Sequence, residues 1–194
     1  MSYFRPQKSR KIGPRSIYSL PHSTQTLSQK PGRVNLVSPE TSPPSGGVLR
    51  TGLPTDRDAV RAILEETSLS SPAPGDPERA TEARIGEVLS IVCERDQEVV
   101  GLLAWRNLGR EAEILDLAVR GKDRRHGFAT LLLNNFLQQA TASGLEQVFL
   151  EVRESNRPAM ALYKKFGFQI TGRRPNYYCR PQEAALLMRL ELRG

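Results

Sequence analysis

Beyond residue 46 the chain shows the two apolar periodicities of a folded domain. Apolar residues recur at helical spacing in 56–67 and again between Gly127 and Gly144, while shorter apolar runs are bounded by turn signals. We predict helices over 56–67, 78–85, 127–144 and 156–166, the last with Ser155 as its cap and Gly167 as its end. The predicted strands are Val48–Thr51, Val88–Glu94, Val99–Arg106, Glu111–Val119, Val148–Val152, Phe168–Thr171 and Leu186–Leu192.

The order of these elements predicts a mixed sheet. Turn signals at 95–97 and 107–110 join three strands into an antiparallel meander. The strand that ends at Val119, the helix after Gly127 and the strand 148–152 then form a βαβ unit, whose two strands should lie parallel with a right-handed crossover. We therefore expect an α+β fold with a mixed sheet of six or seven strands and helices on both faces.

The composition divides the 194 residues into a tail and one domain. Residues 1–39 hold seven of the 28 Lys and Arg residues and no acid, which leaves 28 − 7 = 21 basic against 21 acidic residues in the rest of the chain. Half of the 14 prolines lie in residues 1–46. We expect a disordered basic tail over 1–46 and a single domain over 47–194.

Several roles fit such a tail. Its Ser- and Arg-rich, acid-poor composition fits an organellar transit peptide, a nucleic-acid-contacting arm, a start codon set too early or a solvated extension, and the sequence does not choose among them. Cytoplasmic location is the default expectation, with organellar import open. No apolar run approaches the length of about 18–20 residues that crosses a bilayer, so no membrane contact is expected. Cys93 and Cys179 are expected as reduced thiols, and neither histidine stands at metal-ligand spacing from them, so no metal is expected.

The loop before the long helix carries the first chemical signal. It reads Arg120-Gly-Lys-Asp-Arg-Arg-His-Gly-Phe-Ala129, a basic turn with a glycine at the entrance of a helix. Backbone amides and the helix dipole at such an entrance favour an anion, and the added cationic side chains suit a pyrophosphate. Taken alone, an ordinary basic turn explains this loop as well.

A second segment is more specific. It contains Leu150-Glu-Val-Arg, Ser155-Asn, Leu162-Tyr163 and Gly167-Phe168, and is followed by Arg174-Pro-Asn-Tyr-Tyr178. With the Arg-Arg-His-Gly-Phe-Ala loop, these motifs resemble the GNAT acetyltransferase superfamily, and within it the RimI-type branch that acetylates a ribosomal-protein alanine. The resemblance covers about Val48–Leu192. It implies acetyl transfer from acetyl-CoA to an amine.

The resemblance also implies roles for individual residues. The acetyl-CoA-binding residues would be Leu117, Ala118, Val119, Arg124, Arg125, His126, Gly127, Phe128, Ala129, Thr130 and Asn156. Tyr163 would give a proton to the departing thiolate, and the base would be Glu151 or Glu113. The acceptor groove would be shaped by Arg174, Asn176, Tyr177 and Tyr178.

Structural explanations for the same residues stay open at this point. Tyr163 could pack on its helix near Phe166, and either glutamate could be a strand carboxylate paired with Arg153 or another neighbour. The segment that ends at Tyr178 could be a β-turn with half-buried aromatic rings.

The sequence departs from the RimI-type pattern near the acceptor side. Residues 68–77 lack the aromatic residues that members of that branch carry after the first helix. The favoured function is acetylation of a protein N-terminal α-amine, with a ribosomal protein among the candidate acceptors. The alternatives are acetylation of a small amine or a lysine, and a non-catalytic CoA-fold module tethered to RNA or the ribosome by the tail.

Overall fold

The computed structural model describes residues 46–67, 88–179 and 181–192. The tail expected over 1–46, apart from Gly46, and the helix expected over 78–85 lie outside these ranges. The strands are β1 (Val48–Thr51), β2 (Leu89–Arg95), β3 (Glu98–Leu108), β4 (Glu111–Val119), β5 (Gln147–Arg153), β6 (Gln169–Cys179) and β7 (Gln182–Glu191). The α-helices are α1 (Arg57–Thr67), α3 (Phe128–Ala142) and α4 (Arg157–Lys165), and short 3-10 turns cover Pro54–Asp56 and Gly121–Asp123.

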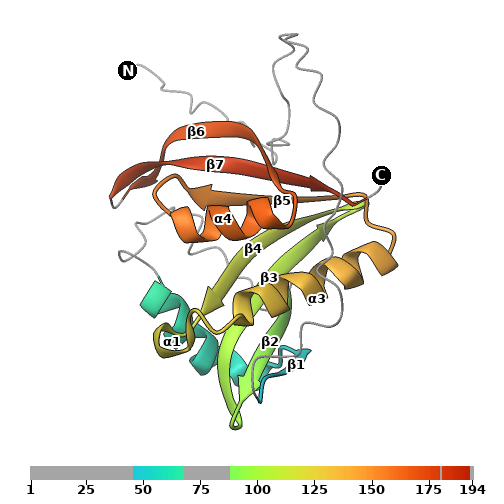
Figure 1. The fold of residues 1–194 in the computed structure, drawn as a ribbon, viewed down its shortest axis with the longest axis vertical. Coiled ribbons are helices and arrows are strands. Elements are labelled where there is room, and N and C mark those ends of the chain that lie inside the picture. Colours follow the sequence, from blue (N-terminus) through green and yellow to red (C-terminus); the bar gives the residue numbers. More distant parts are fainter. Residues whose placement is uncertain (1–45, 68–87, 180, 193–194) are drawn as a thin grey trace, which may run out of the picture. The chain divides into compact units, whose positions relative to one another are not determined.

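The seven strands form one mixed sheet in the order β1-β2-β3-β4-β5-β7-β6 (Figure 1). Every neighbouring pair is antiparallel except β4 and β5, which run parallel as the predicted βαβ unit requires. The expectation of an α+β fold with a mixed sheet is confirmed. Two strand predictions were too short: β6 continues to Cys179, past the segment that could have been a turn, and β7 begins at Gln182 instead of Leu186.

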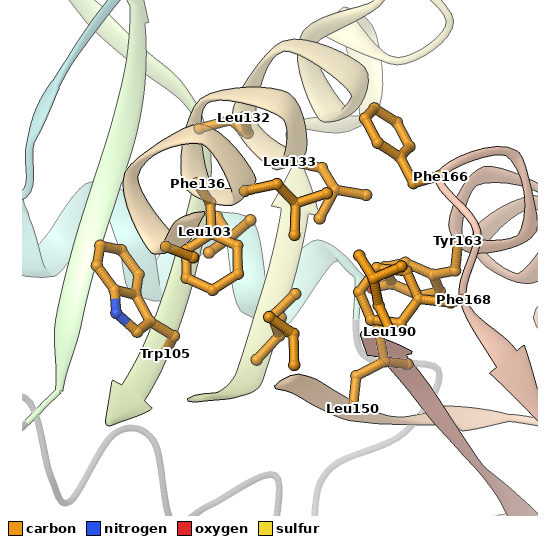
Figure 2. Packing of buried hydrophobic residues seen from close by; sticks show 14 of the residues in the cluster. Leu103, Trp105, Leu132, Leu133, Phe136, Leu150, Tyr163, Phe166, Phe168 and Leu190 are labelled. Carbon is orange, nitrogen blue, oxygen red and sulfur yellow. The ribbon is translucent and has the colours of Figure 1, made fainter. Parts of the chain in front are cut away.

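Helices lie on both faces of the sheet because both faces carry apolar residues. One face packs against α3 and α4, and Figure 2 shows Trp105 of β3 beside Phe136 of α3, with ring centroids 5.0 Å apart. The other face packs against α1 through a smaller cluster of Ile63, Val92, Leu102, Ala104 and Ala118. The α3–α4 face therefore holds the larger core, and it anchors the two helices that border the candidate site.

Local polar contacts also fix the entrance of α1. The carboxylate of Asp56 accepts two bonds from the guanidinium of Arg50, at 2.7 and 2.9 Å, and a third from the backbone N–H of Leu53 at 2.7 Å. The hydrogen bonds from Arg50 outweigh burial and hold the pKa of Asp56 below its ordinary value. This carboxylate ties β1 to the start of the helix.

Candidate active site

An opening in the sheet lies between β4 and β5. The two strands pair from Glu111–Gln147 to Ile114–Leu150, and β5 continues alongside β7 as far as Arg153. A bulge in β4 interrupts its pairing with β3 between Ile114 and Asp116. Beyond this bulge β4 follows β3 and diverges from β5, as Figure 1 shows. The backbone of Leu117, Ala118 and Val119 thus borders the opening.

The start of α3 lies next along the chain and has the geometry of an anion site. Arg125 and Gly127 have φ values of 68° and 88°, so the backbone turns twice through the left-handed region before the helix begins. The first helical bond runs from the N–H of Leu131 to the carbonyl of Gly127. The amides of Phe128, Ala129 and Thr130 therefore lie in the first turn, where backbone N–H groups have no acceptor inside their own helix.

A buried carboxylate holds this loop in place. Asp123 is fully buried and accepts hydrogen bonds from Arg95 of β2 at 2.5 Å and from Arg120 at 2.6 Å. Arg124 donates to the carbonyl of Val119 at 3.1 Å, and the Nδ1 atom of His126 lies 3.2 Å from the carbonyl of Asp123. Several polar side chains of the loop thus make contacts that stabilise the loop itself. The exposed Arg125 stands beside the first-turn amides.

The start of α4 borders the opening from the β5 side. Asn156 is the N-cap, since its side-chain oxygen accepts from the N–H of Ala159 at 3.2 Å. The predicted cap, Ser155, is wrong by one residue; its backbone N–H donates to Glu183. The side-chain oxygen of Asn156 is engaged by the helix, so its side-chain NH₂ is the group that it offers to a ligand.

Tyr163 of α4 lies in the core at the border of the opening. Its ring packs against Phe168 with centroids 5.6 Å apart, close to Leu190 (Figure 2). Burial raises the pKa of the phenol well above its ordinary value, and the charge of Asp116 on β4 raises it further. The sequence motif implied Tyr163 as a donor, but it did not identify Asp116 as an influence on it. A phenol in this environment stays protonated and can donate.

Glu151 of β5 joins a cluster of polar side chains on the face of the sheet that points away from α3 and α4. Its Oε1 atom lies 2.6 Å from Nη1 of Arg174, and Tyr177 donates a hydrogen bond to the same carboxylate. Burial and this hydrogen bond raise the pKa of Tyr177. The ring of Tyr177 lies edge-on to that of Tyr178, with centroids 5.1 Å apart.

The bulge in β6 explains how these side chains meet. Regular pairing with β7 is interrupted between Arg174 and Tyr178, and Asn176 adopts a φ of 54°, which asparagine tolerates better than most residues. Asn176 itself is exposed. The structure therefore brings Arg174 and Tyr177 onto Glu151, while Asn176 shapes the bulge.

Arg153 of β5 and Glu183 of β7 lie next to this cluster, where Arg153 contacts the Tyr178 ring. The Arg153 side chain is only 8% exposed, and its guanidinium carbon lies 3.9 Å from the centroid of the Tyr178 ring. Its Nη1 atom lies 3.6 Å from the carboxylate of Glu183 on β7. Sequence reasoning considered Arg153 as a partner of Glu151, whereas the structure pairs Glu151 with Arg174. Glu183 gave no sequence signal.

Glu113, the second candidate base, occupies a different environment. It lies on β4 directly opposite Arg106 of β3, and two guanidinium nitrogens of Arg106 contact its Oε2 atom. The Glu113 side chain is 12% exposed. This arrangement is a cross-strand ion pair.

The described ranges contain neither a metal-ligand cluster nor a membrane-spanning helix. Within 46–67, 88–179 and 181–192, no group of three or more His, Cys, Asp and Glu residues is placed to hold a metal ion. Across the same residues no helix is long and apolar enough to span a membrane. Cys93 and Cys179 are free thiols, as predicted.

Together these features provide the parts of a candidate group-transfer site: a helix start that suits an anion, an open strand border, a buried tyrosine and a carboxylate. Residues 58–168, more than half of the chain, match the model of the acetyltransferase (GNAT) family. The chain therefore belongs to the GNAT acetyltransferase family, which confirms the resemblance read from its motifs.

Named relatives refine this comparison. The chain is 34% identical over 98 residues to a "Putative [ribosomal protein bS18]-alanine N-acetyltransferase" of Bacillus subtilis, covering 50% of this chain and 65% of that protein. It is 33% identical over 107 residues to the "[Ribosomal protein bS18]-alanine N-acetyltransferase" of Haemophilus ducreyi, covering 54% of this chain and 74% of that protein. The match to the Bacillus protein thus spans slightly less than two thirds of its length.

Solved structures show the same fold. The structure of Ard1 from Thermoplasma volcanium superposes with a TM-score of 0.65 and 29% identity over 77% of this chain and 99% of that chain. A Bacillus subtilis acetyltransferase in complex with CoA superposes with a TM-score of 0.63 and 16% identity over 75% of this chain and 98% of that chain. A protein of this fold therefore binds coenzyme A.

Proposed function

We propose that this protein transfers an acetyl group from acetyl-CoA to the α-amine at the N-terminus of a protein. The observation that carries the proposal is the cluster around Glu151, in which a carboxylate, an arginine and two tyrosines gather on the acceptor side of β5. The buried Tyr163 lies on the helix that borders the same opening. The names of the two curated relatives, both alanine N-acetyltransferases, support this acceptor class.

The loop before α3 fits the phosphate part of acetyl-CoA. The first-turn amides and the exposed Arg125 are donors that a pyrophosphate prefers, and the helix dipole adds a partial positive charge. Bound there, acetyl-CoA supplies an activated thioester. The backbone of Leu117–Val119 borders the opening and can donate an N–H to a carbonyl oxygen as negative charge develops on it. Asn156 lies at the start of α4 and can bind the ligand through its side-chain NH₂.

Two side chains handle the protons of the reaction. Glu151 accepts the proton that the amine loses as its nitrogen bonds to the acetyl carbon, directly or through a water. Tyr163 gives its hydroxyl proton to the departing sulfur, and the phenol is protonated at neutral pH. Glu113 remains bound to Arg106 and takes no part.

The acceptor's own pKa favours an N-terminal amine. An α-amine with a pKa of about 7.7–8.0 is roughly 10–15% neutral at pH 7, whereas a lysine near 10.4 is about 0.04% neutral. At pH 7, forming the neutral amine therefore costs about 3–4 kcal/mol more for the lysine than for the α-amine. A half-buried carboxylate such as Glu151 therefore needs to do little more than receive one proton from an α-amine.

The finer proposal is that the acceptor is an N-terminal alanine of a ribosomal protein in the cytoplasm. It is tested by incubating the full chain and acetyl-CoA with three acceptors: a peptide with a free N-terminal alanine, an N-blocked peptide with one lysine, and polyamines. Mass spectrometry should detect acetylation of the first peptide at its α-nitrogen. Acetylation confined to lysine or to polyamines overturns the proposed acceptor, and absence of turnover with all three overturns the proposed activity.

A further inference from the structure

The carboxylates near the proposed acceptor site are engaged in ion pairs before any substrate is considered. Three of them are each paired with one arginine: Glu113 with Arg106, Glu151 with Arg174, and Glu183 with Arg153. An α-amine of ordinary pKa arrives mainly as an ammonium ion at pH 7. Its binding at Glu151 would bring a second cation to a half-buried carboxylate that already holds Arg174, which is unfavourable unless that arginine leaves.

Arg174 is the arginine that can leave most easily. Its side chain is 29% exposed, compared with 8% for Arg153, so its guanidinium can reach solvent without crossing the core. Arg106 is equally exposed, but it holds Glu113 through two nitrogens, whereas the contact between Arg174 and Glu151 is made by Nη1 at 2.6 Å.

The backbone at Arg174 also permits such a movement. Arg174 lies on β6, which is an edge strand of the sheet, at the position where the pairing of β6 with β7 is interrupted. The Tyr177 ring, whose centroid lies 5.5 Å from the guanidinium carbon, gives Arg174 a second partner beside Glu151. The hydrogen bond from Tyr177 keeps Glu151 oriented when the guanidinium departs.

We propose that Arg174 is a displaceable counter-ion of Glu151: its guanidinium takes the position of the acceptor's ammonium group, and the binding acceptor exchanges one cation for the other. The inference rests on the proposed function and adds a basis for selectivity. A free amine can replace Arg174, but an acetylated N-terminus is neutral and cannot. After Glu151 has passed its proton to solvent, Arg174 pairs with the Glu151 carboxylate again, and this pairing favours release of the product.

The test compares substitutions at two adjacent arginines. Arg173 is the matched control, because it pairs with Glu154 at 2.7 and 3.1 Å and lies exposed on the same strand. Affinities are measured by calorimetry in the presence of CoA, for a peptide with a free N-terminal alanine and for the same peptide acetylated. Because a partly exposed ion pair is weak, Arg174→Gln should lower the Kd and KM of the free peptide about 2–5-fold. The Kd of the acetylated peptide should not change.

Three further variants make the interpretation specific. Arg173→Gln should leave both Kd values unchanged, and Arg174→Lys, which keeps the charge, should restore the wild-type Kd of the free peptide. In a Glu151→Gln background, Arg174→Gln should no longer tighten binding, since the competition is for that carboxylate.

Two results separate this inference from the proposed function. If the wild type acetylates the peptide but Arg174→Gln weakens binding, or changes both peptides equally, Arg174 is a direct acceptor contact and the exchange is refuted. If the wild type neither binds nor acetylates any free-amine peptide, the proposed function and the exchange fail together.

Discussion

Removing the hydroxyl of Tyr163 is the most direct test of the proposed chemistry. Tyr163 is buried in the main core, where its ring packs against Phe168, and phenylalanine keeps that ring while losing one oxygen atom. Tyr163→Phe should therefore fold normally. If the phenol is the general acid, the substitution should lower kcat by about 10²–10⁴-fold, which corresponds to about 2.7–5.4 kcal/mol in the barrier.

The assay follows the release of free CoA thiol at saturating acceptor, with thermal unfolding recorded in parallel. The KM values should change little, because the hydroxyl acts at the departing sulfur and not in acceptor binding. Burial and Asp116 raise the pKa of Tyr163, so the wild-type rate should show no alkaline loss from this group below about pH 10. A Tyr163→Phe enzyme within threefold of the wild-type rate would remove Tyr163 from the mechanism.

Four other substitutions test separate parts of the structure. Glu151→Gln should lower kcat by about 10²-fold or more. Glu113→Gln should leave kcat within a few-fold of the wild-type value but lower the melting temperature. If both variants lost the same amount of activity, the assignment of Glu151 as the base would be contradicted. Gly127→Ala places a side chain at a φ of 88°, which costs about 1–2 kcal/mol, and calorimetry should show weaker CoA binding. Asp56→Asn should cost about 1.5–3 kcal/mol at pH 7, measured by denaturant unfolding, because it removes the charged acceptor of Arg50. Since the folded-state pKa of Asp56 is depressed, the wild type should hold this advantage above about pH 4 and lose it as the pH falls further; a gap between the two proteins that does not narrow on acidification would refute this reasoning.

The elements that could be predicted from sequence are those whose periodicity is long and uninterrupted. The helix α3 buries Leu132, Leu133, Phe136, Leu137 and Ala140, and this spacing alone identifies it. The strand β6 was predicted too short because Gly172, Pro175 and a bulge interrupt its alternation. Its continuation depends on pairing with β7, which a local pattern does not show.

The candidate site was predictable to a similar degree. The motifs placed Glu151, Tyr163 and the loop before α3 at the site, because each motif is contiguous in the chain. The partner of Glu151 was missed, since Arg174 reaches it across β7, a neighbour that the sequence order does not reveal. Alternation along the hairpin could have found the pair of Arg106 and Glu113, which face each other across one turn.

The buried carboxylate of Asp123 has a further consequence for how the loop before α3 meets its ligand. Because Asp123 already anchors Arg95 and Arg120, the loop is preorganised and loses little conformational freedom when an anion arrives. Asp123 and Glu98 together balance the charges of Arg95 and Arg120, so the anion meets the fixed peptide dipoles and the exposed Arg125. CoA affinity should accordingly decline less steeply with rising ionic strength than that of a site built from several unpaired arginines.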